Sequence, residues 1–329
     1  MAAHLAHSNG SLRTSLSGHS QKTCFKGAFY NSLPVSFGVP QDSILGPLFF
    51  ILFINDLPFF LSFLPSSGIT MFADDTTLLS TGKNVPESAV NLNILASSDD
   101  LPWARQNRMA LNATKSKCML FTSQQKRRLL SSKNLDVSIN DSPIQQVRCA
   151  KVLGEKFDES ASWEPHVESL CKLLNSRLCL VRRISHYLNK SGTLRFYNAC
   201  LHSKLLYYSS VWGSCLHNFL LQNQRLQKHA ARIILSADYT KPSVDLFSEL
   251  NWIPIADLVK CKKLQLLFSI VVNPDAPVFL RQKLDFLTSS RYATRGSTAN
   301  NLKLKQPRTN FGKSCFSFSA PLLLCSSIR

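Results

Sequence analysis

The stretch Ile69-Thr-Met-Phe-Ala-Asp-Asp-Thr-Thr-Leu-Leu79 places two adjacent carboxylates between two apolar runs. The runs are rich in β-branched and apolar residues of the kind that favour strands. Aspartate disfavours strand interiors and accepts turn geometry, so Asp74 and Asp75 mark the turn of a predicted β-hairpin. The sequence therefore predicts a half-buried pair of strands with both carboxylates at its tip.

Two like charges side by side at a tight turn repel each other unless a cation lies between them. Mg²⁺ fits this place, because it takes carboxylate oxygens and leaves positions open for substrate phosphates. The alternative is a solvent-exposed Asp-Asp turn without a ligand, and the dipeptide alone favours that alternative.

Two segments upstream of the hairpin reverse that preference. Gly38-Val-Pro-Gln-Asp-Ser-Ile-Leu-Gly-Pro47 is followed directly by Leu48-Phe-Phe-Ile-Leu-Phe-Ile-Asn-Asp-Leu57. In order and spacing, these segments and the hairpin resemble the palm motifs of a non-LTR (LINE-type), jockey-like retrotransposon reverse transcriptase. Weaker matches follow at 109–121, 151–158 and 250–254, so the resemblance runs through nearly the whole chain.

The resemblance implies an α+β fold in four parts. After a disordered N-terminus at 1–15, a partial polymerase palm would occupy residues 16–158, with an antiparallel sheet and a buried helix. An all-α thumb at 159–240 and a helical and irregular basic C-terminal region at 241–329 would follow. The residues agree, since helical periodicity begins near Ser162 and the run 48–57 is apolar on every side, as in a buried helix. We expect a loop at 124–133, and a strand from 109–121 or from the start of the chain beside Asp74.

The resemblance also implies roles for individual residues. Asp74 and Asp75 would be the catalytic carboxylates and metal ligands, and Lys115 would donate a proton to pyrophosphate. The positions that bind template and substrate would be Gln41, Ser43, Phe72 and Ala73. The implied cofactor is Mg²⁺ in a two-metal site, and the implied partners are an RNA template, a DNA primer and deoxynucleotides.

The chain departs from the pattern of the family in two places. A further metal-binding Asp is expected from a strand early in the palm, but no Asp or Glu precedes Asp42. Asp42 itself stands where the family has Gly, and it adds a carboxylate where phosphates should pass. We therefore expect a truncated reverse transcriptase domain that lacks the fingers and is inactive alone. The alternative is a catalytically dead remnant that still binds nucleic acid.

The charge of the chain supports a polyanionic partner. Its 38 Lys and Arg outnumber 20 Asp and Glu, which gives a net charge of +18 and favours nucleic acid over membrane. The phosphate contacts on the predicted thumb would be Lys172, Arg177, Arg182 and Arg183. The alternative for these residues is ordinary solubilising charge.

No membrane or secretion signal is evident. The apolar run from Ile44 to Leu64 carries Asn55-Asp56 near its middle, and a central Asp costs about 2.5–3.5 kcal/mol on insertion. The ten cysteines show no disulfide spacing, and we expect Cys200-x-His202 and Cys215-x-His217 to be packed thiols rather than zinc ligands. The sequence thus predicts an intracellular protein, cytoplasmic or nuclear.

Overall fold

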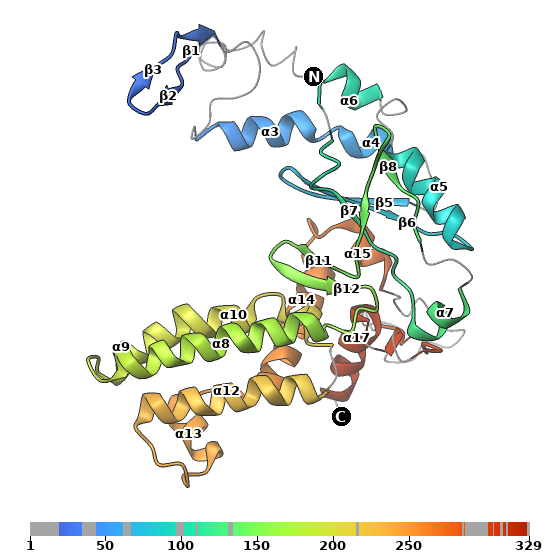
Figure 1. Ribbon diagram of the computed structural model, residues 1–329. Helices are drawn as coiled ribbons and strands as arrows, with labels where there is room; N and C mark the ends of the chain where they lie inside the picture. The colour runs from blue at the N-terminus through green and yellow to red at the C-terminus, as the bar shows by residue number, and fades with distance from the viewer. Residues whose placement is uncertain are drawn as a thin grey trace. The chain divides into compact units, whose positions relative to one another are not determined.

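The computed structural model describes residues 20–34, 44–61, 67–96, 102–109, 111–130, 134–214, 217–284, 286, 302–304, 306–309, 312–313 and 315–327 (Figure 1). The expected disordered N-terminus at 1–15 lies outside these residues, as do Gln41, Asp42 and Ser43. The chain divides into two compact units, Met1–Leu120 with Leu130–Val147, and Phe121–Leu129 with Arg148–Arg329.

The first unit combines short strands with four helices in its described part. The strands are β1 (Ser20–Gln21), β2 (Cys24–Phe25), β3 (Ala28–Phe29), β4 (Leu33–Pro34), β5 (Ser67–Phe72), β6 (Asp75–Ser80), β7 (Lys117–Cys118), β8 (Ser138–Ile139), β9 (Ser142–Pro143) and β10 (Gln145–Gln146). The helices are α3 (Gly46–Ile54), α4 (Leu57–Leu61), α5 (Val85–Ala96) and α6 (Pro102–Gln106).

The predicted hairpin is present as β5 and β6. The two strands pair antiparallel from Ser67 opposite Ser80 to Phe72 opposite Asp75, which leaves a two-residue turn. Among the described residues this hairpin is a sheet of two strands only. The prediction of a neighbouring strand is therefore wrong for residues 20–34 and 111–121, and the rest of the chain's start lies outside the described residues. β7 pairs in parallel with β10 instead, and β1 to β4 pair with one another.

Helix α3 differs from the predicted buried helix. Ile54 is buried against the hairpin, but Leu48, Ile51 and Leu52 are each about half exposed. These three residues lie at i, i+3 and i+4, on one side of the helix. A hairpin of two strands is too narrow to cover a helix on every side, so the outer apolar stripe stays open.

The second unit is largely helical and contains a β-hairpin, which precedes most of its helices. Its strands are β11 (Cys149–Val152) and β12 (Glu155–Asp158). Its helices are α7 (Gln124–Leu129), α8 (Glu164–Ser185), α9 (Lys190–Tyr197), the π-helix η1 (Asn198–His202), α10 (Ser203–Leu206), α11 (Ser209–Trp212), α12 (His217–Leu235), α13 (Ser243–Leu250), α14 (Ile255–Val272), α15 (Val278–Gln282) and α17 (Phe316–Ser327).

The predicted helical periodicity after Ser162 is confirmed in α8, whose buried residues include Val167, Leu170, Leu174, Leu178 and Val181. They form the main core with side chains from α9 to α14. Near the start of both helices, Cys171 of α8 contacts Gln222 and Asn223 of α12. Further along, α8 and α12 again lie side by side and point the same way (Figure 1).

Helix α7 replaces part of the loop expected at 124–133. The hydroxyl of Ser123 accepts a hydrogen bond from the backbone of Lys126, and Arg127 forms an ion pair with Glu159. The three basic residues 126–128 lie in the last turn, where they complement the negative end of the helix dipole. A distant carboxylate, which local sequence does not reveal, thus helps to hold this helix.

Candidate functional site

Asp74 and Asp75 lie at the tip of the β5–β6 hairpin, and both are exposed. Ala73 and Asp74 form the turn, and Ala73 has a φ of 50°, in the left-handed region. That conformation lets two strands reverse over two residues. The carboxylates therefore stand where a ligand can reach them from solvent.

The two faces of the hairpin differ. Ile69, Met71 and Leu78 pack against Ile54, Trp103 and their neighbours on the helices of the first unit. Phe72 lies on the opposite face and is 64% exposed. Because Asp75 is directly opposite Phe72 in the register, its side chain shares this open face.

A contact absent from the sequence analysis supports the packed face. The indole Nε1 of the buried Trp103 donates a hydrogen bond of 2.6 Å to the carboxylate of Asp56, between α3 and α4. Asp56 belongs to the Ile-Asn-Asp-Leu segment at 54–57. The hydrogen bond to its carboxylate joins the end of α3 to α6.

The hairpin supplies only part of a metal site. The part of the chain that the structure describes contains no group of three or more His, Cys, Asp or Glu that could hold a metal ion. Asp74 and Asp75 are consecutive, and Asp75 faces the open side. The pair suits Mg²⁺ only if phosphate oxygens or further carboxylates complete the coordination.

Lys115 lies in an exposed turn of the first unit. The side chain of Asn112 accepts hydrogen bonds from the Thr114 hydroxyl and from the backbone N–H of Lys115, which shapes the turn. Among the described residues no ion pair joins Lys115 to Asp74 or Asp75. The structure therefore leaves the Lys115 side chain available but does not bring it to the carboxylates.

The β11–β12 hairpin is held by the helices of the second unit. Its turn residues Leu153 and Gly154 both have positive φ, and the Tyr207 hydroxyl donates a 2.8 Å hydrogen bond to the Leu153 carbonyl. Glu155 and His166 are buried, with Nδ1 of His166 2.6 Å from the Glu155 carboxylate. Burial raises the pKa of Glu155 and lowers the pKa of His166, since it disfavours the charged form of each.

Asp158 ends this hairpin and starts α8. Its carboxylate accepts hydrogen bonds from the backbone of Ser160, Ser162 and Trp163 and from the Ser160 hydroxyl. Burial alone raises the pKa of Asp158, but these hydrogen bonds outweigh burial and hold the pKa below its ordinary value.

The predicted phosphate contacts on α8 have different surroundings. Lys172, Arg182 and Arg183 are exposed. Arg177 is partly buried and donates a hydrogen bond to the Cys200 carbonyl in the π-helix η1. Because π-helical geometry disturbs the regular backbone ladder, this contact gives Arg177 a structural role.

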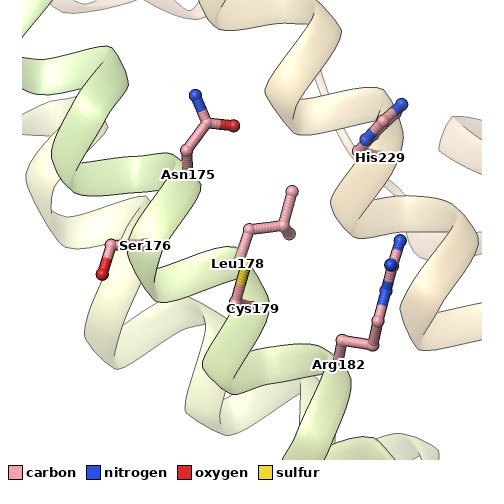
Figure 2. A pocket seen from close by; sticks show the side chains of 6 residues that line it. All are labelled: Asn175, Ser176, Leu178, Cys179, Arg182 and His229. Atoms are coloured by element: carbon pink, nitrogen blue, oxygen red, sulfur yellow. The ribbon is translucent and has the colours of Figure 1, made fainter.

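An open groove of about 400 Å³ runs between α8 and α12. It is lined by Asn175, Ser176, Leu178, Cys179 and Arg182 of α8 and by His229 of α12. Figure 2 shows Asn175, Leu178 and Arg182 reaching toward the space between the two helices. His229 carries no signal in the sequence, because only the packing of α12 on α8 brings it to the same groove as Arg182.

No helix within the described ranges is long and apolar enough to cross a membrane. Eight of the cysteines are free thiols, and Cys215 lies outside the described residues.

Comparison with known proteins supports the resemblance to reverse transcriptases, although no protein-family model matches the chain. The chain is 26% identical over 257 residues to the probable RNA-directed DNA polymerase from transposon X-element of Drosophila melanogaster, an alignment that covers 75% of this chain and 27% of the relative. It is 26% identical over 224 residues to the probable RNA-directed DNA polymerase from transposon BS of the same organism. This alignment covers 65% of this chain and 24% of the relative. It is 23% identical over 228 residues to the RNA-directed DNA polymerase from mobile element jockey. This alignment covers 66% of this chain and 24% of the relative.

The resemblance found in the motifs is thus confirmed. The chain is similar to RNA-directed DNA polymerases of Drosophila transposable elements and spans about a quarter of the length of the curated relatives it matches.

Proposed function

We propose that this chain is a palm and thumb portion of an RNA-directed DNA polymerase from a non-LTR retrotransposon, and that it binds an RNA template with a DNA primer. The observation that carries the proposal is the hairpin with one packed and one open face. Its open face presents Asp75 beside the exposed ring of Phe72. The names of the relatives support the same function.

On this proposal residues 16–158 form the palm, and residues 159–240, which contain α8 to α12, form the thumb. The Phe72 ring offers a flat apolar surface beneath the end of the primer, next to the turn that carries Asp74. Gln41 and Ser43 are proposed to contact the template base and the incoming nucleotide, and Lys115 to give a proton to the departing pyrophosphate. The exposed cations on α8 would contact phosphates, which positions the duplex without reading its sequence.

Asp74 and Asp75 would hold Mg²⁺ together with oxygens of the substrate phosphates. When bound, the metal would neutralise charge on the attacking and leaving oxygens of the displacement. In its absence, two exposed carboxylates repel the phosphates of the primer and of the nucleotide. The residues of the hairpin therefore link nucleic-acid binding to the divalent cation.

This link gives a test that does not depend on turnover. The probe is a labelled RNA–DNA template–primer, and its affinity is measured with Mg²⁺ and with EDTA, for the original chain and for Asp74→Asn with Asp75→Asn. We expect Mg²⁺ to tighten binding by the original chain, and we expect the asparagine variant to bind equally well in both conditions because its charge repulsion is gone.

The matched control changes Asp99 and Asp100, an adjacent pair of aspartates elsewhere in the chain, to Asn. This control should keep the Mg²⁺ effect. If the original chain binds no template–primer, or binds it with the same Mg²⁺ dependence as the hairpin variant, the proposed function is wrong.

A further inference from the structure

The groove between α8 and α12 is lined by Arg182 and other side chains of α8 and by His229 of α12. Asn175, Cys179 and Arg182 follow one another at i, i+4 and i+7 along α8, and each is exposed. His229 lines the groove from α12 and is also exposed. Arg225 precedes His229 by one helical turn and is exposed as well.

The charge around this groove has one sign. From residue 169 to its end, α8 has no Asp or Glu, and α12 has none over its whole length. The cations of these two segments are Lys172, Arg177, Arg182, Arg183, Arg225, Lys228 and Arg232. These two neighbouring segments carry cations and no carboxylates, which creates a positive potential that attracts a polyanion.

Only some of these cations remain available for a ligand. Arg177 donates to the Cys200 carbonyl, and Arg232 donates to the carbonyls of Tyr239 and Lys241. Arg182 lines the groove, whereas its neighbour Arg183 does not. Consecutive residues on a helix point about 100° apart, so two adjacent exposed arginines serve different sides of α8.

We propose that this groove binds the phosphodiester backbone of a nucleic-acid strand, with the Arg182 guanidinium as its main contact and with Asn175 and His229 as polar partners. The inference rests on the proposed function and deepens it, because it assigns the phosphate contact to a two-helix groove rather than to the basic surface of α8 as a whole. An open groove suits a strand that enters and leaves at both ends, and guanidinium and amide groups donate hydrogen bonds to phosphate oxygens.

A thiol footprint tests the location directly. Cys179 lies in the groove, and Cys261 on α14 is an exposed cysteine outside its lining. Both are alkylated with a maleimide, with and without the template–primer, and their modification is followed by mass spectrometry. We expect the nucleic acid to slow the modification of Cys179 at least threefold and to leave the rate at Cys261 unchanged.

Two single substitutions test the contact itself. Arg182→Ala should weaken binding roughly threefold to tenfold at low salt, and should reduce the log–log salt slope by about 0.7–0.9, the value for one phosphate contact. Arg195→Ala is the matched control, since it removes an exposed arginine of α9 that does not line the groove. It should change both quantities much less.

The outcomes separate this inference from the proposed function. If the chain binds template–primer but Cys179 is not protected, or if the two arginine variants are equivalent, the groove assignment is wrong and the proposed function stands. If polyglutamate protects Cys179 as well as the nucleic acid does, the groove takes any polyanion and the assignment to nucleic acid is wrong. If no template–primer binds, both proposals fail together.

Discussion

The carboxylate of Asp56 lies 2.6 Å from the indole nitrogen of Trp103, 47 positions further along the chain. This hydrogen bond joins the segment between α3 and α4 to α6, and it supports the helices on which the β5–β6 hairpin packs. The hairpin that presents Asp74 and Asp75 therefore depends on a carboxylate that has no place in the proposed chemistry.

The first prediction concerns this pair. Asp56→Ala leaves the partly buried indole N–H of Trp103 without its acceptor, so the free energy of unfolding should fall by about 1–2 kcal/mol. The substitution Asn55→Ala at the neighbouring exposed position should cost less than about 0.5 kcal/mol. Urea unfolding of both variants measures the difference, and equal losses would contradict the role given to Asp56.

The second prediction concerns the pH dependence contributed by Asp158. Because its pKa is held below the ordinary value of 3.8, the ionised carboxylate stabilises the fold fully above that pH. This contribution is lost as the pH falls below 3.8 and through the lower pKa of the folded state. Asp158→Asn should therefore flatten the loss of stability as the pH falls below about 4.

At neutral pH, the same Asp158→Asn variant should also unfold more easily, by about 1–2 kcal/mol, because an amide oxygen accepts hydrogen bonds from the start of α8 less strongly. Asp245→Asn, at an exposed position in α13, is the control for both measurements. Should the two variants show the same acid unfolding curve, the carboxylate of Asp158 does not have the proposed effect.

The third prediction concerns Gln227. Its side chain is buried, donates to the Ile253 carbonyl at 2.9 Å and accepts from the Ile255 N–H at 3.0 Å. Gln227→Ala leaves both backbone groups without a partner and should cost about 2–4 kcal/mol. Gln224→Ala on the same helix, where the side chain is partly exposed, should cost far less. Thermal unfolding of the two variants provides the comparison.

The fourth prediction concerns the open apolar stripe of α3. Replacement of the half-exposed Ile51 by Lys should reduce self-association in analytical ultracentrifugation, because an exposed charge interrupts the stripe of Leu48, Ile51 and Leu52. The stability of the monomer should change little. Ile54→Lys, at a buried position one turn away, should instead destabilise the fold strongly.

The fifth prediction concerns catalysis. Two-metal displacement needs more carboxylate ligands than Asp74 and Asp75, so the 329-residue chain alone should not extend a primer on an RNA template, with Mg²⁺ or with Mn²⁺. Gel-based primer extension with labelled deoxynucleotides measures this. Incorporation that disappears in Asp74→Ala would show that the chain is an active polymerase and that this expectation is wrong.

The sequence by itself determined the local elements. The apolar and β-branched residues on either side of Asp74 and Asp75 predicted the hairpin, and the two aspartates predicted its turn, because such residues favour strands and aspartate accepts turn geometry. The spacing of Val167, Leu170, Leu174, Leu178 and Val181 predicted the buried side of α8 in the same way. Such patterns need only the neighbours along the chain, and so did the motifs that carry the resemblance to reverse transcriptases.

Only the tertiary structure decided which polar side chains work together. Arg177, Arg182 and Arg183 look alike in the sequence, yet one binds a distant carbonyl, one lines a groove and one does neither. The position of Arg182 and His229 along one groove, and the pairing of Trp103 with Asp56, depend on how helices far apart in the chain pack. Helical periodicity tells which side of a helix is apolar, but it carries no information on which helix will lie beside it, and the partners of polar groups follow from that packing.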